Sequence, residues 1–242
     1  MSLNPLFNKR VQVLDKGWIE LTDMMPHPDH HEVSGDLAIV NAARVSFLGE
    51  SKGEDQDKKL LFYLLRNHHT SPFEMVEFKF RCHAPLVTWW QWVRHRTWNF
   101  NAQSGRYTPF EENDFYVPDV WRKQSADNKQ ASEGTVDDLK NAELTDQLIE
   151  HYEKSYALYE DALKSGVSRE MARLFLPGFS VYYTWVMKID AHNLMHFLKL
   201  RMDSHAQHEI RVYADVIYEQ FFKPALPWTA EAFEKYVLKA DS

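Results

Sequence analysis

The sequence has 242 residues, of which 44% are hydrophobic and 14% aromatic, so it can form a substantial globular core. Its net charge of −7 argues against a broad nucleic-acid-binding or membrane-binding surface, because each of these needs an extended basic face. No apolar run reaches the ~18 residues of a membrane span and the N-terminus lacks the apolar core of a signal peptide, so we expect a cytoplasmic protein that acts on a small molecule.

The first part of the chain predicts alternating strands and helices. Residues 11–24 are expected to form two short strands around Lys16 and Gly17, because their Val, Leu, Trp and Ile side chains favour strands. Asp36 is expected to cap a helix that continues to residue 47, and residues 55–67 form a second, amphipathic helix. Pro72 then forces the chain into an extended corner before a strand over 76–83.

The only cysteine of the sequence, Cys82, lies near the end of that strand. A single cysteine excludes an intramolecular disulfide and a metal cluster with several cysteine ligands. A nucleophilic role stays open, but no motif surrounds Cys82 and it alternates within a strand pattern. We therefore expect a small buried core residue.

Pro85 starts a short helix that is expected to present Gln91 and Arg94 on one face. Three tryptophans of this helix are interpreted as packing residues, because nothing else in the chain resembles a surface that stacks bases: Trp89, Trp90 and Trp92. Residues 108–135 are polar with little periodicity, and loops of this length often form a lid or an oligomer contact. Motif residues lie on both sides of this stretch, so we expect a single domain over 1–242.

The second half predicts mainly helices around one strand. A long helix is expected over 135–164, ended by Gly166, and Ser168 caps a short basic turn that carries Arg169 and Arg173. Residues 179–189 are rich in aromatic and branched side chains and predict a central strand. Asp190 is expected to cap a helix over 191–202, residues 203–222 the next helix, and Pro224 and Pro227 separate a terminal helical segment.

Residues 94–107, RHRTWNFNAQSGRY, gather basic and amide side chains in a chain that is acidic overall. Guanidinium groups pair bidentately with phosphate, and Asn, Gln and Ser recognise neutral polar edges beside it. This composition indicates a small phosphorylated ligand rather than nucleic acid.

The same stretch resembles the signature RHRxxSxNExSxRY of flavin-dependent thymidylate synthases. It departs from that signature at two positions, with Asn99 for the first Ser and Ala102 for the Glu, and it matches at Arg94, His95, Arg96, Asn101, Ser104, Arg106 and Tyr107. Residues 69–75 resemble a further segment of the family, H-x-T-P-F-E-H, with Ser71 and Met75 as departures. Residues 169–177 resemble its REIARxxLP element, and residues 193–211 resemble its N-L-x-x-F-L-x-L-R-x-D-x-H-A-Q-x-E-I-R element.

The resemblance implies an α/β (α+β) fold in which an antiparallel sheet core packs with long helices, assembled as a homotetramer with shared active sites. It implies methylation of dUMP to dTMP with FAD as cofactor and with NADPH and 5,10-methylenetetrahydrofolate as co-substrates. The residues that it places at dUMP are Gln91, Trp92, Val93, Arg94, Ala102, Gln103, Ser104, Gly105, Arg106, Arg173 and Arg201. The residues that it places at the flavin are Ser71, Arg94, His95, Arg96, Ala102, Asp190, Ala191, His192 and His196.

Arg201 is the predicted catalytic residue, because a positioned guanidinium stabilises negative charge on N3 and O4 of the uracil ring. Ser104 has no neighbouring triad base and is interpreted as a substrate hydrogen-bond partner. His192 and His196 have the spacing of two zinc ligands, but no HExxH glutamate or third ligand accompanies them, so we predict no metal. Ala102 keeps one alternative open, a catalytically impaired homologue that binds flavin and nucleotide; a non-catalytic RNA- or DNA-binding module is disfavoured by the net charge.

Overall fold

The computed structural model describes residues 4–30, 33–126 and 132–239. Its centre is a five-stranded sheet in the order β1-β2-β3-β7-β4, and every neighbouring pair is antiparallel. The strands are β1 Val11–Val13, β2 Gly17–Met25, β3 Glu77–Pro85, β7 Tyr182–Asp190 and β4 Asn99–Ala102. The expected fold class, an antiparallel sheet packed with helices, is confirmed.

The hairpin of β1 and β2 depends on glycine at its turn. A side chain at Gly17 would place its Cβ 2.0 Å from the Tyr213 hydroxyl and 2.7 Å from the Val13 carbonyl oxygen, so only glycine fits there. The predicted pair of strands around Lys16 and Gly17 is therefore confirmed. Tyr213, which is far away in the sequence, packs directly against Gly17.

One face of β3 forms the centre of the hydrophobic core. Phe78, Phe80 and Cys82 alternate along the strand and are fully buried. Phe78 and Phe80 pack on the rings of Phe222 and Phe221, which come from the C-terminal helices. The expectation that Cys82 is a buried core residue is confirmed, and burial raises the pKa of its thiol well above the ordinary value.

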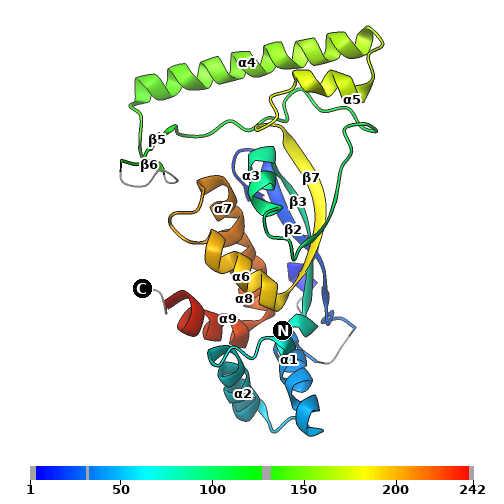
Figure 1. The fold of residues 1–242 in the computed structure, drawn as a ribbon, viewed down its shortest axis with the longest axis vertical. Coiled ribbons are helices and arrows are strands. Elements are labelled where there is room, and N and C mark those ends of the chain that lie inside the picture. Colours follow the sequence, from blue (N-terminus) through cyan, green and yellow to red (C-terminus); the bar gives the residue numbers. More distant parts are fainter. Residues whose placement is uncertain (1–3, 31–32, 127–131, 240–242) are drawn as a thin grey trace.

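The helices surround the sheet at both ends and on one face (Figure 1). In the orientation of Figure 1, α4 and α5 lie across the upper end, α6, α7 and α8 stack beside the sheet, and α1, α2 and α9 gather at the lower end. Their bounds are α1 Gly35–Arg44, α2 Glu54–Arg66, α3 Leu86–Trp92, α4 Asp138–Lys164, α5 Arg169–Ala172, α6 Ala191–Arg201, α7 His208–Val216, α8 Lys223–Ala225 and α9 Pro227–Phe233.

Shorter elements connect these helices and strands. The 3₁₀ turns are Asn4–Leu6, Val45–Phe47, Ser71–Met75 and Arg173–Phe175, and the π-helical turns are Ile217–Phe222 and Glu234–Leu238. A separate two-stranded sheet is formed by β5 Arg122–Gln124 and β6 Ser132–Thr135. It lies in the stretch predicted to be irregular, and residues 127–131 of that stretch are outside the described residues.

The predicted cap of the first helix was wrong. Ser34, not Asp36, accepts the hydrogen bond that begins α1, from the backbone N–H of Leu37. Asp36 is buried and accepts the backbone N–H groups of Trp228 and Thr229 at 2.8 and 3.1 Å, together with the Thr229 hydroxyl at 2.6 Å. Asp36 therefore caps α9, and burial raises the pKa of its carboxyl while these hydrogen bonds oppose the rise.

Several predicted boundaries also differ from the structure. Pro72 lies inside a 3₁₀ turn rather than in an extended corner, and the strand predicted from residue 179 begins at Tyr182. The helix predicted from residue 203 begins at His208, after a turn in which Asp203 accepts hydrogen bonds from His205. Pro224 sits near the start of α8, where a missing N–H is tolerated, so the chain breaks only at Leu226.

The long helix α4 builds a second, smaller core over residues 110–117. Tyr152 and Tyr159 are buried against Phe110 and Phe115, and the Tyr159 hydroxyl accepts the backbone N–H of Phe110 at 3.2 Å. Other apolar positions of α4 stay uncovered within one chain, since Leu139 is 82% and Leu158 53% exposed. The predicted helix is confirmed, with an apolar surface that this chain does not bury by itself.

Candidate active site

Arg201, the last residue of α6, joins residues that are far apart in the sequence. Its Nε donates to Nε2 of His95 at 2.8 Å, and its Nη1 donates to Oε1 of Gln91 at 3.3 Å. Gln91 comes from α3 and His95 from the turn that follows α3, so the packing of α6 beside α3 creates this cluster. Two of the predicted site residues, His95 and Gln91, therefore meet around the half-buried guanidinium of a third, Arg201.

His95 is neutral in this cluster. Burial lowers the pKa of His95 from 6.5 to about 4, and the neighbouring charges of Arg201 and His196 add to the shift. A neutral imidazole whose Nε2 accepts a hydrogen bond carries its proton on Nδ1. Among the described residues no carboxylate pairs with Arg201, so both of its partners are neutral and its positive charge is not compensated.

The predicted flavin residues of α6 continue along the helix away from Arg201. The His196 ring lies 6.4 Å from the His95 ring, and Nδ1 of His192 lies 3.5 Å from Oε1 of Glu74. That Nδ1 is buried and makes no hydrogen bond among the described residues. Within the described ranges, no three His, Cys, Asp or Glu side chains are grouped as a metal site.

Asp190 and Ala191 form the start of α6. Asp190 caps the helix, because its carboxylate accepts the backbone N–H of Asn193 at 2.9 Å and the Asn193 side-chain amide at 2.7 Å. Ala191 is fully buried, and its N–H donates to the Val76 carbonyl. The predicted cap is confirmed.

A second cluster forms where the loop after β4 meets α5. Nε of Arg106 lies 3.4 Å from a carboxylate oxygen of Glu170, and Arg169 donates to the backbone carbonyl of Tyr107 at 3.1 Å. A Cβ at Gly105 would lie 2.5 Å from the Phe110 ring and 3.7 Å from the Arg173 side chain. The loop carrying Ser104 to Arg106 therefore packs closely on the basic turn that ends in Arg173.

The residues before this loop lie at the end of β4, the edge strand that pairs with β7. Ala102 is half-buried and pairs with Trp185, and the Gln103 side chain accepts the backbone N–H of Thr184 at 3.0 Å. The Tyr183 hydroxyl donates to the Gln103 carbonyl. This edge fixes the backbone on which the loop starts.

The remaining predicted residues of the motif differ in exposure. Arg94 and Arg96 are exposed and Val93 is half-buried, whereas the Trp92 side chain is fully buried against Trp98, Trp185 and Phe197. Only the backbone of Trp92 can therefore contact a ligand. The packing role is confirmed for Trp92 and Trp89, but it was wrong for Trp90, which is 61% exposed.

The predicted flavin residue Ser71 lines a cavity of about 910 Å³ between α1, α2 and the turn before β3. Sequence reasoning missed the polar residues on its other wall, Arg44, Ser46, Lys52 and His68. The Arg44 guanidinium pairs with the buried carboxylate of Asp57, and its buried Nε has no hydrogen-bond partner among the described residues. For Lys52 a signal was present, because it lies in a polar stretch at residues 49–53 between two predicted helices.

A polar hollow of about 590 Å³ adjoins Arg201 and Gln91. Its other walls come from β5, β6 and the start of α7, and include Arg122, Gln207, Glu209 and Arg211. None of these four was predicted as a site residue. The Q-x-E-I-R run at 207–211 was a signal for them, because it carries polar side chains at the start of a helix.

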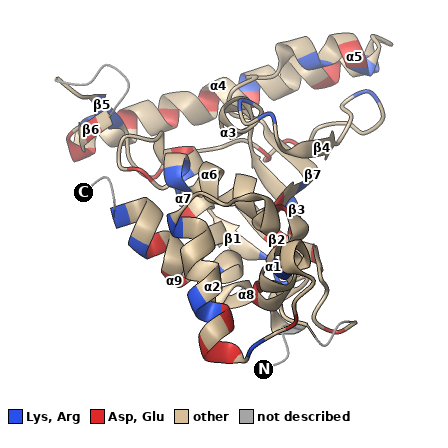
Figure 2. Ribbon diagram, turned by 60° about the horizontal axis from the view of Figure 1, so that its bottom comes forward, with Lys and Arg blue, Asp and Glu red and all other residues tan. Residues whose placement is uncertain are grey.

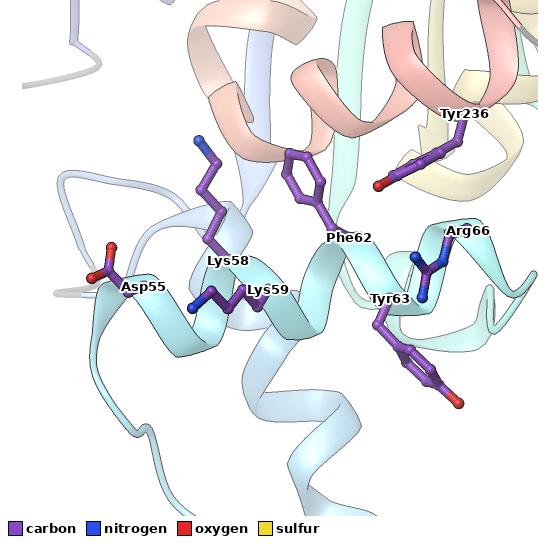
Figure 3. Close-up of a pocket in the computed structure, with 7 residues that line it drawn as sticks. All are labelled: Asp55, Lys58, Lys59, Phe62, Tyr63, Arg66 and Tyr236. Carbon is purple, nitrogen blue, oxygen red and sulfur yellow. The ribbon is translucent and has the colours of Figure 1, made fainter.

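A third hollow lies on the outer side of α2 and holds none of the predicted site residues. It measures about 370 Å³ and is lined by Asp55, Lys58, Lys59, Phe62, Tyr63, Arg66 and Tyr236 (Figure 3). Lys58 pairs with Glu231 at 2.6 Å, and Phe62 meets the Tyr236 ring edge-on. These contacts join α2 to the C-terminal helices.

The charges are dispersed over the molecule. Basic and acidic segments alternate along α2, α4 and the C-terminal helices rather than forming one basic face (Figure 2). Across the described ranges, no helix has the length and apolar character needed to cross a membrane.

Comparisons with known proteins agree with the motifs. The family model described as thymidylate synthase complementing protein matches residues 30–228. The flavin-dependent thymidylate synthase of Dictyostelium discoideum is 44% identical over 232 residues, which cover 95% of this chain and 75% of that protein. A flavin-dependent thymidylate synthase of Thermus thermophilus is 45% identical over 229 residues, covering 95% of this chain and 80% of that one.

Solved structures show the same relationship. The UMP/dUMP methylase PolB from Streptomyces cacaoi bound with 5-Br UMP is 33% identical, with a TM-score of 0.79, over 93% of this chain and 96% of that chain. The structure of PolB bound with 5-Br dUMP is 32% identical, with a TM-score of 0.80, over 93% of this chain and 98% of that chain.

Proposed function

The chain belongs to the flavin-dependent thymidylate synthase family and is a methyltransferase, and we propose that it converts dUMP to dTMP with 5,10-methylenetetrahydrofolate as carbon donor, FAD as flavin and NADPH as reductant. The observation that carries this proposal is the environment of Arg201. Its guanidinium is held by two neutral acceptors, His95 and Gln91, so its charge remains available to a ligand. The impaired homologue is the less favoured alternative, because relatives 44–45% identical over most of the chain carry the name of the active enzyme.

The proposed role of Arg201 follows from the chemistry of uracil. Hydride addition at C6 forms an enolate with negative charge on C5 and O4 of the ring, and attack by C5 on an electrophilic carbon is helped when the ring already carries negative charge on N3 and O4. A guanidinium stabilises that charge without accepting a proton, and it acts best when it is already oriented. The hydrogen bonds to His95 and Gln91 supply this orientation. Burial lowers the pKa of Arg201, but the ordinary value of an arginine is so high that the side chain keeps its charge.

The phosphate of dUMP is assigned to the cationic side chains of the motif. Arg94 is exposed beside the Arg201 cluster, and in the second cluster Arg173 packs near Gly105 while Arg106 pairs with Glu170. Ser104 and Gln103 offer neutral hydrogen-bonding groups beside them. No protein nucleophile is required, which agrees with the burial of Cys82 and the raised pKa of its thiol.

The residues present fit a flavin dinucleotide. The cavity beside Ser71 is large, and its wall carries Lys52 and Arg44, whose buried Nε has no partner among the described residues. Cationic and hydroxyl side chains of this kind suit a diphosphate. His192, His95 and His196 are assigned to the isoalloxazine side, and the buried Nδ1 of His192 makes no hydrogen bond among the described residues. When bound, the flavin supplies the redox chemistry, and the chain's own residues position the reactants.

A homotetramer with shared sites is supported by two features of the single chain. No hydrogen bond or ion pair joins the Arg201 cluster to the Ser104 to Arg106 loop within the described residues, although both are assigned to dUMP. Large apolar side chains also stay uncovered near α5, with Leu174 73% and Phe179 70% exposed. Association of chains would cover these side chains and could bring the Arg201 cluster of one chain to the Ser104 to Arg106 loop of another. A cytoplasmic location and the absence of nucleic-acid partners remain predictions.

The visible spectrum of the purified protein tests the cofactor assignment. We expect flavin absorption bands that bleach when NADPH is added under anaerobic conditions. A colourless protein that FAD cannot reconstitute would contradict the assignment. Tritium release from [5-³H]dUMP that depends on methylenetetrahydrofolate, with dTMP as product, then tests the reaction itself, and flavin-bound protein without turnover would favour the impaired homologue.

A further inference from the structure

Beyond Gln91, the Arg201 cluster continues into residues that have no assigned role. Nε2 of Gln91 donates to Oε1 of Gln207 at 3.2 Å, and Nε2 of Gln207 donates to Oε2 of Glu209 at 2.9 Å. Together with the bond from Arg201 to Gln91, this forms an unbroken row of three hydrogen bonds from α6 through α3 to the start of α7. Figure 1 shows α6 and α7 side by side, as this row requires.

The two ends of the row have fixed and opposite hydrogen-bonding character. An arginine side chain can only donate, and an ionised carboxylate can only accept. The two glutamine amides between them can point either way, because each carries both a carbonyl oxygen and an NH₂ group. Glu209 forces Gln207 to turn its NH₂ toward the carboxylate, so Gln207 offers oxygen to Gln91, and Gln91 in turn offers oxygen to Arg201.

Glu209 is itself held firmly. It is 4% exposed, and its Oε1 accepts the Arg122 guanidinium of β5 and the Tyr116 hydroxyl, the latter at 3.2 Å. Burial disfavours the charged carboxylate, but the hydrogen bonds from Arg122 and Gln207 outweigh it and lower the pKa of Glu209. Glu209 is therefore ionised at neutral pH and keeps its acceptor character.

We propose that Glu209 is a positioning residue for Arg201: it sets the amide orientations of Gln207 and Gln91, and thereby keeps an oxygen facing the catalytic guanidinium. The inference rests on the proposed function, in which Arg201 acts on the uracil ring. It also gives a role to residues 116 and 122, in the stretch whose sequence indicated only a lid or an oligomer contact.

The substitution Glu209→Gln tests this orientation with almost no change in volume. Arg122 and Tyr116 both donate to the Oε1 side, so the new amide would keep its oxygen there and turn its NH₂ toward Gln207. Both native glutamines would then reverse, and Gln91 would present NH₂ to a guanidinium that can only donate. We expect kcat at saturating dUMP to fall about ten-fold or more, because one hydrogen bond to a charged group is lost.

The exchanged pair Gln207→Glu with Glu209→Gln restores the original direction. The amide now at position 209 would donate to the carboxylate now at position 207. That carboxylate would accept from Gln91, and Gln91 would again offer oxygen to Arg201. We expect this double variant to recover kcat to within about three-fold of the parent, as expected when the lost hydrogen bond is remade. A residue with a merely structural role gives no such recovery, so a low kcat in a folded double variant would overturn the proposal.

Folding is controlled separately from orientation. Glu20→Gln is the matched control, because Glu20 is also buried and accepts two arginines, Arg10 and Arg81, at a remote place in the sheet. It should lower thermal stability and leave kcat unchanged. If Glu209→Gln does not fold, Gln207→Met breaks the row while leaving the pair of Glu209 and Arg122 intact, and parent-like kcat in that variant would overturn the proposal.

The same measurements separate this inference from the proposed function. A flavin-loaded parent without turnover would contradict the proposed function, whereas an active parent with an equally active Glu209→Gln variant would contradict the positioning role alone. Equilibrium titration with dUMP gives a readout that needs no turnover. Affinity should weaken in Glu209→Gln and return in the exchanged pair, and equal affinity in the parent and both variants would again overturn the positioning role.

Discussion

Replacing Arg201 with lysine changes the geometry of one cation while keeping its charge. The guanidinium reaches two acceptors from two different nitrogens, His95 at 2.8 Å and Gln91 at 3.3 Å. A lysine ammonium has its donors on one nitrogen at the end of a flexible stem, so Arg201→Lys cannot hold both acceptors in the native geometry and cannot present a planar fork to uracil. A hydrogen bond from a charged donor contributes about 1.5–3 kcal/mol, so we expect a loss of about ten- to a hundred-fold in kcat.

The distribution of this loss between binding and turnover is informative. The retained charge should preserve part of the dUMP affinity, so kcat should fall more than the affinity for dUMP. Tritium release from [5-³H]dUMP at matched flavin occupancy measures turnover, and equilibrium titration measures affinity. Arg10→Lys is a suitable control, since Arg10 also donates through Nε, to Glu20, far from the site. If Arg201→Lys turned over like the parent, Arg201 would not activate the uracil ring.

Three further predictions concern two site residues and one core residue. Ala102→Glu should raise kcat about ten-fold or more at saturating substrates, because it returns an oriented acceptor to the half-buried end of β4; tritium release measures this. Cys82→Ala should keep full activity and lose about 1–2 kcal/mol of unfolding free energy in urea titration, because it removes only a small buried side chain. His95 should stay neutral down to about pH 5 in an NMR titration, because burial and Arg201 lower its pKa to about 4.

The pKa of His95 also fixes the sign of its effect on stability. The unfolded chain, with an ordinary pKa of 6.5, binds a proton between about pH 4 and 6.5 that the folded chain does not bind. His95 therefore makes the folded state less stable as the pH falls through this window, and the effect levels off below about pH 4.

Each of these expectations has an outcome that would contradict it. Unchanged or lower turnover in Ala102→Glu would mean that the chain compensates elsewhere, through Asn99 or His196. An inactive but folded Cys82→Ala protein would indicate thiolate catalysis. Protonation of His95 near pH 6.5 would mean that Arg201 does not donate to it.

Local patterns in the sequence were enough for most elements and for the motif residues. The apolar spacing of residues 55–67 predicted α2 within one residue, and Asp190 was recognised as a cap because a cap acts on N–H groups two or three residues away. Arg201 and His95 were identified through the resemblance of their motifs. Helix periodicity and capping depend on neighbouring residues, and motif residues are identified by their resemblance to a known family, so both can be predicted without knowledge of the fold.

Contacts between distant residues depended on the tertiary structure. Asp36 has the residue type of a local cap, yet it caps α9, which starts near residue 227, because burial brings α1 against that helix. The Q-x-E-I-R run marked Gln207 and Glu209 as polar residues at the start of a helix, but their partners, Gln91 and Arg122, lie on separate elements and were not predictable from that run. Which partner a polar side chain finds is decided by how the helices pack on the sheet, and the periodicity of any one helix contains no information about that packing.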